Sequence, residues 1–154
     1  MKIKLNFILN SILYLFLLSN CGYQPLYSSK SQEFSFGKIE IYGDKDLVKF
    51  FGDQMKRFQN DTENSYNLIV NVDNSVNAIS KDKKGNPSIY SLSISTKIDF
   101  FKEDELHKTN TFYESSTYNN MENKFDLKRY EQRLEKKLLN NIVEDIIIYT
   151  QNMQ

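Results

Sequence analysis

Residues 90–100, YSLSISTKIDF, form the most regular stretch of the chain and decide its fold. Apolar and polar side chains alternate along it. One parity holds Tyr90, Leu92, Ile94, Ile98 and Phe100, and the other holds Ser91, Ser93, Ser95, Lys97 and Asp99. A period of two places these sets on opposite faces of a β-strand. The stretch therefore predicts a strand of an antiparallel sheet with one face on a core and the other in water.

Two further stretches predict strands next to this one. Residues 66–78 alternate between apolar and mostly amide side chains, and residues 81–87, KDKKGNP, are typical of a turn. Residues 102–105, KEDE, predict the next turn. Residues 106–118 predict a fourth strand, rich in Thr, Tyr and Phe but poorly alternating. This weak pattern indicates an edge strand, or a strand with both faces covered.

An additional strand and a helix are predicted before these three strands. Residues 38–42 alternate and predict a strand, and Gly37 breaks the alternation before it, which predicts a β-bulge. Asp44 is a suitable N-cap for the helix that follows, because its carboxylate can accept hydrogen bonds from the free amides of the first turn. Apolar residues at helical spacing continue this helix to Phe58.

The longest predicted element is a helix over residues 126–150. Asn123 and Asp126 resemble a capping arrangement at its start. One apolar stripe runs along it and comprises Leu127, Tyr130, Leu134, Leu138, Ile142 and Ile146. Two helices over one face of a four-stranded, mostly antiparallel sheet would bury both apolar stripes. The sequence thus predicts an α+β fold, a two-layer sandwich with the order β-α-β-β-β-α.

The first twenty residues differ in character from the rest. Lys2 and Lys4 precede an apolar run over residues 5–18, LNFILNSILYLFLL, and no acidic residue occurs before Glu33. A helix that spans a bilayer needs roughly 20 apolar residues. A run of this length therefore favours the core of a cleaved signal peptide, and an uncleaved membrane helix is the alternative.

The apolar run ends in LSNCG, which resembles the bacterial lipobox that directs lipid attachment to a cysteine. Leu18, Ser19 and Cys21 fit that pattern, whereas Asn20 stands where Gly or Ala is usual. Cys21 is the only cysteine, so an intrachain disulfide is excluded and a buried structural thiol is the alternative interpretation. The resemblance implies a covalent diacylglycerol and an N-acyl group on Cys21, and Gly22 in place of Asp indicates the outer membrane.

These signals divide the chain into three parts. We expect residues 1–20 to be a cleaved signal peptide, residues 21–33 a lipidated N-terminus and tether, and residues 34–154 a single domain. Removal of the signal peptide leaves 18 basic and 20 acidic residues, a balance that does not favour nucleic-acid binding. Apart from the lipid on Cys21, no cofactor is expected.

The opening of the mature chain carries a family resemblance. Residues 21–27, CGYQPLY, look like the Cys-Gly-aromatic-x-Pro-Leu-Tyr start of alphaproteobacterial LPS-assembly lipoproteins, the LptE family. The predicted element order is similar to that family's fold, and so is the closing stretch, with Tyr118 and Asn119 before a long helix. The resemblance covers essentially the whole mature chain. It implies an outer-membrane lipoprotein on the periplasmic side that plugs and helps assemble the LptD β-barrel and binds lipopolysaccharide during its delivery to the outer leaflet.

Five residues are candidates for contact with lipopolysaccharide or the barrel. Lys81, Lys83 and Lys84 form a compact basic cluster at the predicted hairpin tip. Lipid A carries phosphates, and lysine binds phosphate as a flexible point charge. An ordinary solvated turn is the alternative. Tyr113 and Tyr118, on the weak fourth strand, are candidates for a partner surface, whereas most other aromatic residues coincide with predicted core positions.

The residues required for a familiar catalytic or metal site are missing from the pattern. His107 is the only histidine, and no Gly-rich phosphate loop or nucleophile elbow occurs. We therefore expect a binding protein rather than an enzyme. An auxiliary envelope lipoprotein of another lipid-transport system is the main alternative, and a periplasmic hydrolase-like enzyme is the less favoured one.

Overall fold

The computed structural model describes residues 35–60, 62 and 65–153, all within one compact unit, Glu33–Gln154. Its elements are β1 (Phe36–Gly43), α2 (Lys45–Met55), the short 3-10 helix η1 (Lys56–Phe58), β2 (Tyr66–Lys81), β3 (Pro87–Lys102), β4 (Glu105–Asn119) and α3 (Lys124–Gln151). The predicted α+β class and element order are confirmed. Cys21, the predicted signal peptide and the predicted tether lie outside the described residues.

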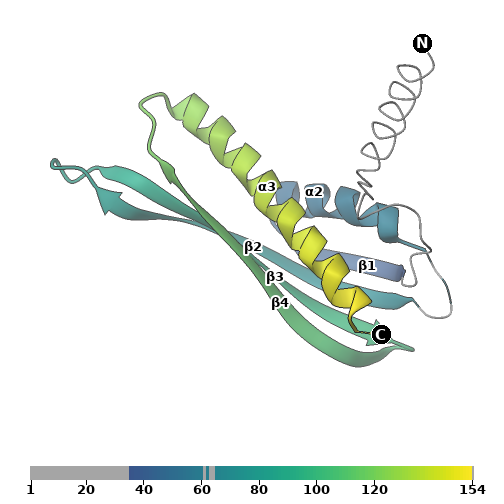
Figure 1. The fold of residues 1–154 in the computed structure, drawn as a ribbon. Coiled ribbons are helices and arrows are strands. Elements are labelled where there is room, and N and C mark those ends of the chain that lie inside the picture. The colour runs from purple at the N-terminus through teal and green to yellow at the C-terminus, as the bar shows by residue number, and fades with distance from the viewer. Residues whose placement is uncertain (1–34, 61, 63–64, 154) are drawn as a thin grey trace, which may run out of the picture. The chain divides into compact units, whose positions relative to one another are not determined.

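The four strands form one open sheet in the order β1-β2-β3-β4. β1 runs parallel to β2, because α2 carries the chain back between them, whereas β2–β3 and β3–β4 are antiparallel hairpins. The predicted bulge at Gly37 is confirmed by a register shift between Phe36 and Ile39. Both helices lie on the same face of the sheet (Figure 1).

The strands differ in length, so the longer strands extend past the end of the shortest one. β1 has 8 residues, whereas β2 and β3 have 16 each and are longer than their alternating cores suggested. β1 pairs with β2 only as far as Val72, opposite Gly43. The β2–β3 hairpin therefore projects well beyond the end of β1, together with part of β4 (Figure 1).

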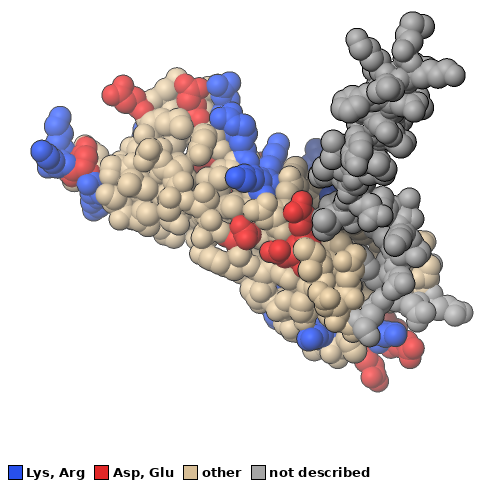
Figure 2. Space-filling model, viewed as in Figure 1, with Lys and Arg blue, Asp and Glu red and all other residues tan. Residues whose placement is uncertain are grey.

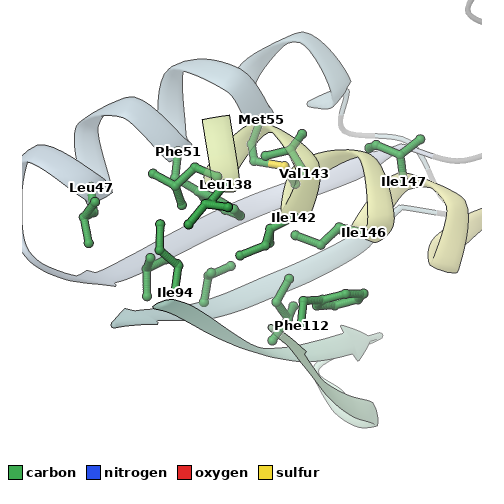
Figure 3. Close-up of a cluster of buried hydrophobic side chains, with 14 of the residues drawn as sticks. Leu47, Phe51, Met55, Ile94, Phe112, Leu138, Ile142, Val143, Ile146 and Ile147 are labelled. Atoms are coloured by element: carbon green, nitrogen blue, oxygen red, sulfur yellow. The ribbon is translucent and has the colours of Figure 1, made fainter. Parts of the chain in front are cut away.

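The core lies between the inner face of the sheet and the two helices. Figure 3 shows side chains from both helices meeting those of the sheet. The labelled ones are Leu47, Phe51, Met55, Ile94, Phe112, Leu138, Ile142, Val143, Ile146 and Ile147. Burying one large apolar side chain stabilises a fold by about 1.5–3 kcal/mol. The helices are therefore held to the sheet mainly by this layer.

The buried face of α3 is wider than the predicted apolar stripe. Leu139, Val143, Ile147 and Thr150 are also buried, whereas Tyr130 is only half-buried. The reason is that α3 packs against α2 as well as against β3 and β4. A helix with neighbours on two sides buries a wider face than a helix laid on a sheet alone.

Both predicted helix caps are present. The Asp44 carboxylate accepts a hydrogen bond from the backbone N–H of Asp46 (2.9 Å). The Asn123 side chain accepts from the N–H groups of Phe125 (3.0 Å) and Asp126 (3.4 Å). The Asp126 side chain forms an ion pair with Arg129 (3.0 Å). None of the described helices is both long and apolar enough to cross a bilayer.

Candidate contact surface

The face of the sheet opposite the helices, here called the open face, is built from rows of directly paired side chains. Three successive rows cross β2, β3 and β4. They are Asn77–Ser91–Thr117, Ser75–Ser93–Ser115 and Asp73–Ser95–Tyr113. Each member belongs to the parity opposite to that of the core residues, so each points away from the helices. The polar side chains of residues 90–100 thus lie at the centre of a continuous polar surface.

The chemistry of the open face is mostly neutral. The hydroxyls of Ser75 and Ser93 lie 2.8 Å apart and are hydrogen-bonded. Farther along, Asp99 accepts a hydrogen bond from Thr109 (2.6 Å) and lies 3.7 Å from the ammonium of Lys97. Small hydroxyl and amide groups both donate and accept hydrogen bonds. Such a face suits a polar partner without requiring that charges be matched.

Of the two candidate tyrosines, only Tyr113 is exposed. Tyr113 belongs to the open face, and its side chain is 63% exposed. Tyr118 is 5% exposed, and its ring stacks on Tyr90 with 5.5 Å between ring centroids. The expectation that Tyr118 lies on a partner surface is therefore wrong. Residues five apart on a strand point to opposite faces, so the sequence parity itself could have separated the two.

The buried Tyr118 hydroxyl has a partner on α3. It donates a hydrogen bond to the Glu131 carboxylate at 2.6 Å. Burial, followed by this hydrogen bond, raises the pKa of the Tyr118 hydroxyl far above its usual value. The contact joins β4 to the first half of α3, so Tyr118 is a structural residue.

The three candidate lysines lie at the tip of the β2–β3 hairpin, as predicted, and are exposed. Asp82 shapes the tip, because its carboxylate accepts hydrogen bonds from the backbone N–H groups of Lys84 (2.8 Å) and Asn86 (2.9 Å). These bonds, chiefly the one from Asn86, hold the pKa of Asp82 below its usual value. Figure 2 shows the resulting basic cluster at the end of the projecting hairpin. Its contact role stays a prediction.

A polar hollow between the two helices and β2 was not predicted. It has a volume of about 570 Å³ and is lined by Asp44, Asp46 and Asp53 of the α2 region and by Asn74, Lys128 and Glu135, among others. We call it the helix hollow. Glu135 accepts a hydrogen bond from the Asn74 amide (2.9 Å), and burial raises the pKa of its carboxyl. Sequence spacing carries no signal for this site, because its two sides are distant in the chain.

His107 takes no part in a metal-binding arrangement. Its ring lies near Tyr66, with 5.6 Å between ring centroids. In the part of the chain that the structure describes, no group of His, Cys, Asp and Glu side chains is placed to hold a metal ion. The open face and the lysine tip, formed by Lys81, Lys83 and Lys84, are thus the two candidate contact surfaces.

The fold is similar to those of solved bacterial lipoproteins. The rare lipoprotein B from Shewanella oneidensis matches over 77% of this chain and 98% of its own, with a TM-score of 0.59 and 8% identity. The minor lipoprotein from Acinetobacter baumannii covers 73% and 87% (TM-score 0.57, 11% identity), and a lipoprotein from Caulobacter crescentus covers 77% and 92% (0.54, 12%). No family model and no curated protein matches the chain by sequence. These identities are low, and what the chain shares with the bacterial lipoproteins is the fold.

Proposed function

We propose that this chain is an outer-membrane lipoprotein of the LptE type, anchored by lipid on Cys21 and facing the periplasm. In this role it plugs and helps assemble the LptD β-barrel and binds lipopolysaccharide during delivery to the outer leaflet. The CGYQPLY opening and the fold shared with bacterial lipoproteins support the assignment. The open face is the observation that carries it.

A plug inside a barrel must match a wet, polar wall. The interior of a transmembrane β-barrel is polar, and burying an unpaired charge against it would be costly. Asp73 is the one charged member of the three rows on the open face, and the Ser, Thr and Asn side chains there present neutral groups that hydrogen-bond in either direction. Tyr113 adds one large amphipathic side chain of the kind enriched at protein interfaces.

The lysine tip accounts for the lipopolysaccharide half of the proposal. Lys81, Lys83 and Lys84 occupy the end of a hairpin that projects from the body of the domain (Figure 2). Ammonium groups on flexible stems can reach several phosphate oxygens without a preformed pocket. Stable attachment to the membrane comes from the acyl chains, because each buried methylene contributes about 0.8 kcal/mol.

The test is capture of the barrel from intact outer membranes. A photo-crosslinking amino acid is placed in the full chain at Ser93 or Tyr113 on the open face, and at Lys137 on the exposed side of α3 as the matched control. We expect a large, heat-modifiable barrel to be crosslinked from Ser93 and Tyr113, and more strongly than from Lys137. Recovery of no barrel from any position would overturn the plugging role, and recovery of a different lipid-transport component would favour the auxiliary alternative.

A further inference from the structure

β2 has an edge that no described strand covers over residues 73–81. β1 occupies this edge as far as Val72 and ends at Gly43. Gly43 has a φ of 143°, and a side chain there would collide with the carbonyl oxygen of Val72. The chain therefore leaves the sheet at Gly43, and beyond this point β3 is the one described strand that pairs with β2.

This edge lacks most of the features that keep sheet edges from pairing. Unpaired N–H and C=O groups on a strand edge form a template for another strand, and proteins usually block such an edge with proline, charge or cover. Residues 73–79 are exposed, and they include Val76 (44% exposed) and Ile79 (56%). The pairing of β2 with β3 is irregular at two places near the end of the stretch, between Ala78 and Ser80 and between Ser80 and Lys81.

We propose that the edge of β2 over residues 73–81 pairs with the same edge of a second copy of this chain. The two strands run antiparallel about a two-fold axis near Asn77, which joins two four-stranded sheets into one. This goes beyond the role proposed above, since it describes the chain in the absence of a barrel. A pairing of this kind is isologous, and closed two-fold pairs are the commonest oligomers.

The register between the two copies of β2 follows from the part of the β2 edge that β1 and the hairpin turn leave free in each copy. The partner strand cannot extend past Asp73, because β1 begins to cover the edge at Val72. The same strand ends at Lys81, where the turn begins with Asp82. These two limits place Asp73 opposite Lys81 and bring the two-fold axis to Asn77.

Charge complementarity supports a second copy as the occupant. In this register the carboxylate of Asp73 faces the ammonium of Lys81, once at each end of the interface. Among the described residues neither side chain forms an ion pair within its own chain. The lysine tip of each copy also extends toward the other copy's helix hollow, whose lining is mixed in charge, with Asp44, Asp46, Asp53 and Glu135 beside Lys49, Lys128 and Lys136. The charge complementarity therefore rests on the two Asp73–Lys81 contacts.

The proposal is tested with the full chain in detergent by sedimentation velocity over a range of concentrations. We expect the native chain to form a dimer. Asp73→Lys or Lys81→Glu alone puts like charges opposite each other at both ends and should weaken self-association by roughly tenfold or more. Asp73 and Lys81 lie at opposite ends of this stretch of β2, so neither substituted side chain pairs with the other position within one chain.

Mixing the two variants is the decisive measurement. In an equimolar mixture the new lysine of one variant faces the new glutamate of the other, and native Lys81 faces native Asp73, so dimer formation should return. Asp145→Lys and Lys137→Glu, which make the same charge changes on exposed positions of α3, should leave self-association unchanged. A native chain that stays monomeric, or single variants that associate like it, would overturn the proposal. Barrel capture from Tyr113 is read separately, so failure of one proposal is distinguishable from failure of the other.

Discussion

Two buried threonines differ in how their hydroxyls are satisfied. Thr96 on β3 and Thr150 on α3 are both 0% exposed. The Thr150 hydroxyl donates a hydrogen bond to the carbonyl oxygen of Ile146 (2.8 Å). The Thr96 hydroxyl finds no hydrogen-bond partner among the described residues. A buried polar group without a partner costs free energy that folding has to offset elsewhere.

Replacing Thr96 with valine should therefore stabilise the protein. Thr96→Val removes the unsatisfied hydroxyl and keeps the branched shape, so we expect the free energy of unfolding to rise by about 1 kcal/mol. Thr150→Val, the matched control, loses a hydrogen bond and should be neutral or destabilising by up to about 1 kcal/mol. Urea denaturation of the full chain measures both. Equal destabilisation by the two substitutions would contradict this account of Thr96.

Glu135 should make stability depend on pH in the acidic range. Burial raises the pKa of its carboxyl above the usual value for a glutamate, although Lys128 and Asn74 oppose that shift. The folded state therefore favours the protonated form, and ionisation of Glu135 weakens folding as pH rises through the folded pKa. Glu135→Gln should accordingly raise the free energy of unfolding at neutral pH.

The pH dependence of the stability gained by Glu135→Gln distinguishes an effect of ionisation from an effect of side-chain packing. Below the pKa of the unfolded chain Glu135 is protonated in both states, so the advantage of Glu135→Gln should vanish there. Unfolding midpoints in urea, measured from neutral pH to below pH 4.5, provide the profile. Glu144→Gln on the exposed side of α3 is the control and should show a change of less than about 0.5 kcal/mol throughout. A gain at Glu135 that persists in acid would point to packing.

At the scale of elements, the end of β1 depends on one glycine. Gly43 combines a φ of 143° with close contact to the backbone of Val72, and the next residue caps α2. Gly85, in the hairpin tip, also has a positive φ (86°), but the space around it is open. A substitution at Gly85 would therefore introduce backbone strain alone, whereas one at Gly43 would combine backbone strain with a steric clash.

Gly43→Ala should be the more damaging of the two substitutions. We expect it to lower the free energy of unfolding by at least about 2 kcal/mol, because the added methyl group must displace β2 or pull β1 out of the sheet. Gly85→Ala meets no neighbouring atom and should cost about 1 kcal/mol for its left-handed backbone. Thermal unfolding followed by circular dichroism compares them. Similar losses at both positions would mean that contact with Val72 does not limit β1.

At the scale of the whole molecule, the lysine tip lies at the end of the hairpin whose strands also carry the rows of the open face. A triple substitution, Lys81→Ala with Lys83→Ala and Lys84→Ala, should reduce retention of lipopolysaccharide by roughly tenfold, because exposed ion pairs contribute about 0.2–1 kcal/mol each. Barrel capture through the open face should remain. Binding of the full chain to immobilised lipopolysaccharide measures the first effect.

The control for this prediction has to match the change in charge. Alanine at Lys45, Lys49 and Lys137 removes three exposed lysines from the helices instead, and should leave retention of lipopolysaccharide close to that of the native chain. Equal losses from both triple variants would indicate that binding follows net charge. Retention no better than for a neutral phospholipid in the native chain would remove the cargo role.

The class, order and approximate bounds of the elements could be predicted from the sequence, because each depends on local periodicity. The alternation of residues 90–100, the cap at Asp44 and the bulge at Gly37 all act within a few residues of chain. The lysine tip was predictable for the same reason, since turn chemistry is local.

Which surfaces remain open could not be predicted in this way, because it depends on packing between segments that are distant in the sequence. The wider buried face of α3, the helix hollow and the uncovered edge of β2 all depend on where distant segments stop relative to one another. Tyr118 became a core residue because α3 covers the inner face of β4, whereas Tyr113, on the same strand, faces the other way. Periodicity assigns side chains to two faces of a strand, and packing across the chain determines which face is covered.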